Sequence, residues 1–144
     1  MIQTLTTPDE TARPAAPTAS PGPAAACFTV LLAEDDRALR RYLEVVLRRA
    51  GYEVVAASDG LEAMKAALAG GVHAVVTDAV MPHLGGRELC RFLRRHPKLK
   101  GLPLILLSGS DGADAAGCEA DIHLSKPVRP EELGACLARL LEHA

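Results

Sequence analysis

From residue 27 onward, short runs of apolar residues alternate with longer segments in which apolar residues recur every three or four positions. This pattern is typical of β-strands that alternate with amphipathic helices. The apolar runs predict five strands, at residues 28–33, 52–57, 72–77, 102–107 and 122–124. Because strands joined through helices lie parallel, the pattern predicts an α/β domain whose parallel sheet is covered on both faces.

The segments between the strands carry the usual signals for helix ends. The first predicted helix stops before Gly51, and the second lies between an Asp59/Glu62 capping pattern and Gly70. A third helix ends before Pro97, and the last begins at Pro130. On the first helix, basic and acidic side chains four residues apart are interpreted as solvated ion pairs, namely Arg40, Glu44 and Arg48.

The first 26 residues have a different character from the rest of the chain. They are rich in Pro, Ala and Thr and show no apolar periodicity. Such a segment is predicted to be a disordered tail. The expected division is therefore a tail at 1–26 and one domain at 27–144.

The composition excludes several classes of protein. Of the 144 residues, 49% are apolar but only 3% are aromatic, so the core must be aliphatic. The net charge of −2 argues against a nucleic-acid-binding protein. The four cysteines show no metal-ligand spacing and are interpreted as reduced thiols. No secretion signal or membrane span is found in the sequence, which favours a cytoplasmic location and no membrane partner.

Charged and hydroxyl side chains follow the predicted strands. Asp35 and Asp36 follow the first strand, Asp78 the third, Ser108 the fourth and Lys126 the fifth. In open parallel sheets, ligands bind beyond the carboxyl ends of the strands, so these side chains are expected to meet. Carboxylates without His or Cys favour a hard cation, above all Mg²⁺.

The same set of residues suggests phosphoryl transfer. Asp78 is the candidate nucleophile, and its product would be an aspartyl phosphate. Lys126 would neutralise charge on the phosphoryl oxygens, and the Ser108 hydroxyl would donate a hydrogen bond to them.

As an ordered set, these motifs resemble those of the receiver domain of bacterial two-component response regulators. The motifs are Glu34-Asp35-Asp36, Asp78 with Met81-Pro82 and Gly86, Ser108-Gly109 and Lys126-Pro127. The resemblance runs from about Phe28 to the C-terminus. It implies a flavodoxin-like fold with strand order 2-1-3-4-5, and phosphorylation of Asp78 by a histidine kinase or a phosphotransfer protein.

The resemblance also implies individual roles. Asp36 and Asp78 would bind Mg²⁺ directly together with the backbone carbonyl of Val80, and Asp35 would act through water. Lys126 would contact the phosphoryl group, and the Lys126-Pro127 peptide bond would be cis. Ser108 would couple phosphorylation to the surface. His123 stands at a position commonly held by the switch Tyr or Phe, and it is interpreted either as a second switch residue or as an edge-strand histidine half in solvent.

The chain departs from the family pattern in two places. Only 126 − 108 = 18 positions separate Ser108 from Lys126, about four fewer than usual, and the segment is rich in glycine. The helix that these domains carry there, their fourth, is expected to be short, irregular or absent. Val80 lies two residues after Asp78, where its apolar side chain cannot orient water, so slow self-dephosphorylation is predicted.

Three functional hypotheses follow. The first is a stand-alone receiver that acts by binding an unidentified protein, or as a relay or phosphate sink, and is not a turnover enzyme. The second is a pseudo-receiver, an interaction module that works without phosphate. The third, a phosphohydrolase of the haloacid dehalogenase type, requires a second Asp two residues after the nucleophile, and Asp78-Ala79-Val80 lacks it.

Overall fold

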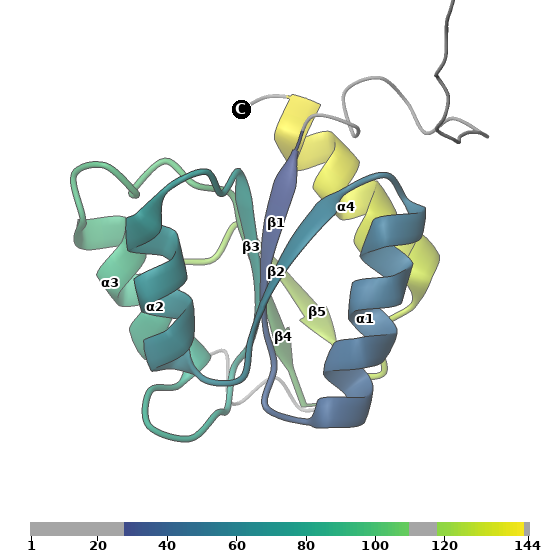
Figure 1. Cartoon of the computed structure of the whole chain (residues 1–144), viewed down its shortest axis with the longest axis horizontal. Coiled ribbons are helices and arrows are strands. Elements are labelled where there is room, and N and C mark those ends of the chain that lie inside the picture. The colour runs from purple at the N-terminus through teal and green to yellow at the C-terminus, as the bar shows by residue number, and fades with distance from the viewer. Residues whose placement is uncertain (1–27, 110–117, 143–144) are drawn as a thin grey trace, which may run out of the picture.

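A parallel sheet of five strands forms the centre of the computed structural model, which describes residues 28–109 and 118–142 (Figure 1). The strand order is β2-β1-β3-β4-β5, so the predicted flavodoxin-like fold class is confirmed. Each strand lies within two residues of its predicted limits. The strands are β1 (Thr29–Ala33), β2 (Glu53–Ala57), β3 (Ala74–Asp78), β4 (Leu104–Ser108) and β5 (Ile122–Ser125).

Four helices in the described part of the chain cover the two faces of the sheet. Helices α1 (Arg37–Arg49) and α4 (Pro130–Glu142) lie on one face, and α2 (Gly60–Ala69) and α3 (Gly86–Arg95) lie on the other (Figure 1). The chain moves outward from β1 to β2 and then reverses across the sheet to β3. Because crossovers between parallel strands are right-handed, this reversal places α1 and α2 on opposite faces.

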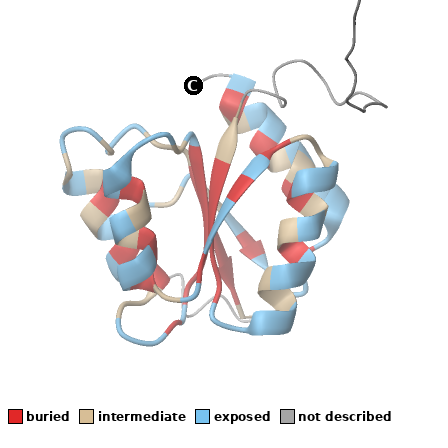
Figure 2. Ribbon diagram, viewed as in Figure 1, coloured by how far each residue is buried: buried red, intermediate tan, exposed pale blue. Residues whose placement is uncertain are grey.

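Alternating strand residues supply two aliphatic cores. Val30 and Leu32 face the layer of α1 and α4, whereas Leu31 and Ala33 face α2 and α3. The central strands β3 and β4 are buried along their whole length (Figure 2). This twofold burial explains why the strands read as unbroken apolar runs.

The predicted helix signals are present at α1 and α2. The side chain of Asp59 caps α2 by accepting a hydrogen bond of 2.8 Å from the Glu62 amide. Gly70 ends that helix with φ at 88°. Glu44 and Arg48 form the expected ion pair on α1, at 2.9 Å.

Some predictions fall outside the described residues. These are the N-terminal tail at 1–26 and the part of the glycine-rich segment at 110–117. Residues 118–121, which complete that segment, contain no helix. Of the described cysteines, Cys90, Cys118 and Cys136 are unpaired thiols. Within the described ranges, none of the helices has the length and apolarity that a membrane crossing needs.

Candidate functional site

The register of the sheet brings the ends of four strands to one edge. Ala33 at the end of β1 pairs with Thr77 of β3, so the acidic residues that follow β1 start beside Asp78. Asp78 in turn pairs with Leu107 of β4. Ser108, the last residue of β4, pairs with Ser125, which precedes Lys126. The predicted convergence of these strand ends is therefore present.

Three carboxylates form a cluster at this edge. Oxygen atoms of Glu34, Asp35 and Asp78 all lie within 4.8 Å of one another. Glu34 is 0% exposed and Asp78 6% exposed, whereas Asp35 reaches the solvent. The Oε1 atom of Glu34 is buried and accepts no hydrogen bond. An oxygen-only donor set that contains an unsatisfied buried oxygen fits a hard divalent cation.

Lys126 balances part of this negative charge. Its Nζ atom lies 2.9 Å from Asp78 Oδ2 and 3.4 Å from Glu34 Oε1. Its backbone amide donates a hydrogen bond of 2.9 Å to the carbonyl of Ser108, and the Lys126-Pro127 peptide bond is cis. Burial lowers the pKa of Lys126, but the hydrogen bond and charge of Asp78, with the charge of Glu34, outweigh this and raise the pKa. The side chain is therefore a permanent cation in the site.

The pKa of Glu34 is shifted as well, above all by burial. Burial raises the pKa of this side chain to about 7, and the charge of Asp78 acts in the same direction. A hydrogen bond from the Asp36 amide and the charge of Lys126 oppose the increase. Without a cation, the site therefore holds a proton more readily than an exposed glutamate would.

Asp36 does not belong to the cluster that Glu34 and Asp35 form with Asp78. Its side chain is the N-cap of α1 and accepts a hydrogen bond of 3.1 Å from the Leu39 amide. The acidic pair beside Asp78 thus lies one residue earlier than expected, at Glu34 and Asp35. The signal was available in the sequence, because an Asp directly before a helix is most often its cap.

Arg40 is a second residue whose place was not predicted. It does not form the expected pair with Glu44. Its Nη1 atom donates hydrogen bonds to the backbone carbonyl of Glu34, at 2.8 Å, and of Asp35, at 3.5 Å. Arg40 therefore binds the backbone of the acidic loop and not its side chains. The carboxylates of Glu34 and Asp35 remain in the cluster with Asp78.

The loop after β3 packs tightly against the end of that strand. The Gly86 amide donates a hydrogen bond of 2.9 Å to the Ala79 carbonyl. A Cβ atom at residue 86 would collide with the backbone carbonyl of Asp78. Only glycine therefore allows α3 to begin this close to the candidate nucleophile.

The same loop is tied to α2. His83 adopts a left-handed backbone conformation with φ at 69°, and its Nδ1 lies 2.9 Å from Asp59 Oδ2. The hydrogen bond from the backbone N–H of Glu62 lowers the pKa of the Asp59 carboxyl, and the contact with His83 acts in the same direction. The loop that follows Asp78 is thus held by the residue that caps α2.

The remaining predicted site residues occupy different environments. Ser108 is buried at the end of β4, one residue beyond the partner of Asp78. Val80 is 59% exposed, two residues after Asp78. His123 is exposed on β5, the last strand of the sheet. Of these three, Ser108 is the one buried at the acidic edge.

Comparisons with known proteins match most of the chain to one family. The family model for the response regulator receiver domain matches residues 30–138. Over 120 residues the chain is 38% identical to the transcriptional regulatory protein GltR of Pseudomonas aeruginosa, which covers 81% of this chain and 50% of GltR. Protein PilG of the same species is 31% identical over 108 residues, which covers 72% of this chain and 80% of PilG. The chain spans about half the length of GltR and of several other relatives that it matches.

Solved structures show the same architecture. The chemotaxis response regulator CheY4 of Vibrio cholerae has a TM-score of 0.71 at 29% identity, over 78% of this chain and 98% of that one. A receiver domain of a histidine kinase from Syntrophus aciditrophicus has a TM-score of 0.76 at 28% identity, over 81% of this chain and 92% of that domain.

Proposed function

Because the chain belongs to the response regulator receiver domain family, we propose that it is a phosphoacceptor of a two-component or phosphorelay system. Asp78 would receive the phosphoryl group from a histidine kinase or a phosphotransfer protein. The observation that carries the proposal is the position of Lys126 Nζ, 2.9 Å from Asp78 Oδ2, next to the Glu34 and Asp35 carboxylates.

The proposed reaction transfers a phosphoryl group from nitrogen to oxygen. A carboxylate oxygen of Asp78 attacks the phosphorus of a phosphohistidine, the P–N bond breaks, and the histidine nitrogen keeps the electron pair. The product is an acyl phosphate on Asp78. Little covalent chemistry is left to the protein, so its task is to position the groups and to neutralise charge. The Lys126 ammonium group, which already contacts Asp78, can follow the charge onto the phosphoryl oxygens.

We propose Glu34, Asp35 and Asp78 as the side chains that hold Mg²⁺, with the backbone carbonyl of Val80 as a further ligand. Bound Mg²⁺ would supply positive charge to the phosphoryl oxygens. The unsatisfied oxygen of Glu34 and the exposure of Asp35 support this set, because Mg²⁺ combines few carboxylates with several waters. Asp36 is excluded from the proposal because its side chain caps α1.

The signal would pass from Asp78 to the surface through Ser108 and His123. Ser108 lies at the end of β4, beside the strand that carries Asp78, and His123 lies exposed on the neighbouring β5. The phosphorylated form would then bind a downstream protein, or pass on or retain the phosphoryl group as a relay or phosphate sink. Phosphorylation and its loss on Asp78 are the only chemistry proposed for the chain.

The direct test is phosphorylation by a small-molecule donor. The full chain is incubated with acetyl phosphate and Mg²⁺, and its intact mass is recorded. We expect the mass to increase by one phosphoryl group in the native protein and in the matched control Asp36→Asn, which keeps a capping side chain. Asp78→Asn should remain unmodified.

Two results would overturn the proposal. The native chain would show no adduct, or Asp78→Asn would be modified as fully as the native chain. The first result would favour an interaction module that works without phosphate, and the second would place the acceptor elsewhere.

A further inference from the structure

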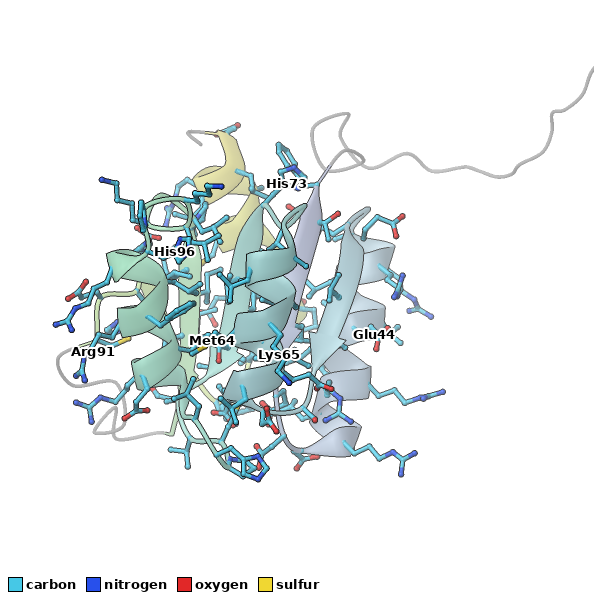
Figure 3. The ribbon with its side chains drawn as sticks, turned by 60° about the vertical axis from the view of Figure 1, so that its left-hand side comes forward. Glu44, Met64, Lys65, His73, Arg91 and His96 are labelled. Atoms are coloured by element: carbon cyan, nitrogen blue, oxygen red, sulfur yellow. The ribbon has the colours of Figure 1, made fainter. Side chains whose placement is uncertain are left out.

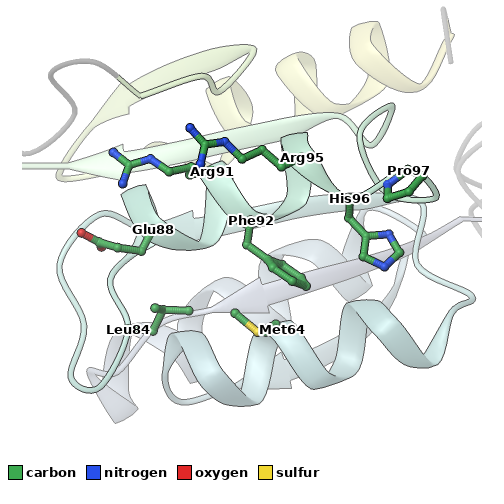
Figure 4. Close-up of a pocket in the computed structure, with 8 residues that line it drawn as sticks. All are labelled: Met64, Leu84, Glu88, Arg91, Phe92, Arg95, His96 and Pro97. Carbon is green, nitrogen blue, oxygen red and sulfur yellow. The ribbon is translucent and has the colours of Figure 1, made fainter.

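A groove lies between α2 and α3, on the face of the sheet opposite α1 (Figure 4). Its volume is about 420 Å³. The floor is apolar, with Met64 from α2 and Phe92 from α3 facing each other and Leu84 at one end. None of these residues belongs to the acidic cluster.

Ring packing and hydrogen bonds position the residues at the two ends of the groove. The ring of His96 packs against Phe92 with centroids 5.8 Å apart, and His96 Nδ1 accepts a hydrogen bond of 3.1 Å from the Lys98 amide. Leu84 is held at the other end, because its carbonyl accepts a hydrogen bond of 3.1 Å from the Gly60 amide. A preformed apolar groove binds a ligand at a lower entropic cost than one that must form on binding.

The apolar surface of the groove continues along α2. Leu61 and Leu68, three residues before and four after Met64, lie on the same face of the helix as Met64. Leu61 is 45% exposed and Leu68 51% exposed. A stripe of three apolar side chains therefore runs along α2 from the groove, and two of them are about half exposed.

Positive charge lines the α3 side of the groove. Arg91 and Arg95 lie one helical turn apart and are exposed, and Figure 3 shows Arg91 extending outward from α3. Among the residues that the structure describes, neither guanidinium group has an ion-pair partner. Arg94, between them, is by contrast bound to Asp121 at 2.8 Å. Like charges at this spacing destabilise a helix, so an acidic ligand would relieve a repulsion that the chain itself leaves in place.

We propose that the groove between α2 and α3 is a docking site for an acidic amphipathic helix of a partner protein. Apolar side chains of that helix would fill the space between Met64 and Phe92, and its carboxylates would pair with Arg91 and Arg95. Glu88, near Leu84 at the opposite end, would favour a basic residue there and so set the direction of the helix. A second copy of this chain is a poor occupant, because a two-fold contact through this face would bring four arginines together.

The test uses a synthetic helical peptide as the probe. It carries leucines at positions i, i+3, i+4 and i+7 and glutamates along one flank, and its binding to the full chain is followed by fluorescence anisotropy. The double variant Arg91→Glu with Arg95→Glu should weaken binding by about tenfold or more. Arg41→Glu with Arg49→Glu on α1 changes the net charge equally at two exposed positions and should leave binding unchanged.

A charge swap separates recognition from damage to the fold. A peptide in which lysines replace the glutamates should bind the Arg91→Glu, Arg95→Glu variant more tightly than it binds the native chain. A misfolded variant cannot gain affinity in this way. Met64→Gln, which keeps the volume but adds a polar group to the floor, should weaken both peptides.

Four results would overturn the proposal. The acidic peptide would show no binding up to millimolar concentration, or would bind the groove variant and the α1 control variant equally well. A concentration-dependent dimer that disappears in the groove variant would assign the groove to a second copy. The N-terminal segment carries two adjacent acidic residues, Asp9 and Glu10. If the double variant Asp9→Lys with Glu10→Lys shifts the NMR signals of Met64 and Phe92, the groove would be assigned to the chain's own N-terminal segment. Because this site is independent of Asp78, its failure would leave the phosphoacceptor proposal intact.

Discussion

The acidic edge of the sheet and the groove between α2 and α3 differ in how far the chain satisfies its own charges. At the edge, Lys126 pairs with both Asp78 and Glu34, and the backbone amide of Asp36 binds the second oxygen of Glu34. In the groove, Arg91 and Arg95 have no such partners within the described residues. The edge therefore pairs part of its charge within the chain, although Glu34 Oε1 still accepts no hydrogen bond, whereas the two arginines of the groove have no ion-pair partner among the described residues.

The two regions also depend on the backbone to different degrees. The edge is assembled by strand register, which fixes where the chain turns after Ala33, Asp78 and Ser108. The groove depends on which helix side chains remain uncovered. The regions meet in the loop of residues 79–85, which follows Asp78 and carries Leu84 into the groove. Five predictions test how far the regions are separate.

The largest expected effect distinguishes two neighbouring aspartates at the edge. Asp35→Asn removes a carboxylate from the cluster and should weaken Mg²⁺ binding by about 100-fold. Asp36→Asn keeps an N-cap of similar quality and should change Mg²⁺ affinity less than about threefold. Calorimetric titration of both variants with Mg²⁺ provides the measurement. Equal losses in the two variants would return Asp36 to the proposed ligand set.

The loop shared by the two regions gives the next effect. Gly86→Ala places a Cβ against the Asp78 carbonyl and should lower the free energy of unfolding by about 1–3 kcal/mol. At Gly134 in α4, a Cβ would meet no atom within 4 Å, so Gly134→Ala should raise stability by about 0.5–1 kcal/mol. Urea denaturation measures both changes. A neutral Gly86→Ala would mean that α3 can move away from Asp78 at little cost.

The third prediction concerns the dependence of folding stability on pH, which we expect to arise from Glu34 at the acidic edge. The pKa of Glu34 is about 7 in the folded chain against an ordinary 4.5, so between these values the folded state keeps a proton that the unfolded state loses. Without a divalent cation, this contribution to stability is complete below about pH 4.5 and is lost as the pH rises through about 7. The expected loss is about 1–3 kcal/mol.

Chemical denaturation in the presence of a chelator, from about pH 5 to about pH 8, measures this loss. Glu34→Gln has no carboxyl to titrate and should show a flatter profile than the native chain. An unchanged slope in that variant would place the responsible proton on another group.

A change beside Asp78 should alter only the lifetime of the phosphoryl group. Val80 is exposed and apolar, so it cannot orient an attacking water. Val80→Asn supplies an amide that can do so, and phosphoryl loss should become severalfold faster with stability unchanged. The decay of the phosphorylated mass after removal of the donor gives the rate. An unchanged rate would show that water is positioned by other groups.

The smallest effect is expected across the two regions. Arg91→Glu with Arg95→Glu should leave the rate of phosphorylation by acetyl phosphate within about twofold of the native rate, because the exposed arginines take no part in the acidic cluster. A large change in this rate would show that the loop of residues 79–85 couples the groove to Asp78, and the two regions would then form one functional unit.

Much of the fold could be predicted from periodicity and helix signals. Unbroken apolar runs are what strands buried on both faces require, and Asp59, Gly70 and Pro130 mark helix ends through local backbone chemistry. Asp78 and Lys126 could be placed in one site because both follow strands of a parallel sheet. These predictions succeed because they depend on neighbours in the sequence or on a topology rule.

The details that failed depend on distances through space. Asp36 was expected beside Asp78, but its position before α1 makes it a cap, and the cluster uses Glu34 instead. Arg40 was expected to pair along its helix and instead binds the carbonyls that precede it. In each case the side chain had two possible partners at similar distances along the sequence, and the three-dimensional structure decides which of them it contacts.

The sequence alone determined the class of fold, the order of the elements and the meeting of Asp78 with Lys126 at the edge. Periodicity shows which residues are buried, and a parallel sheet places the carboxyl ends of its strands at one edge. Only the tertiary structure decided which carboxylates share the cluster, that Gly86 must approach the Asp78 carbonyl, and that Met64 and Phe92 line one groove. Those features arise where segments distant in the chain come together, and their contacts depend on packing that no local pattern specifies.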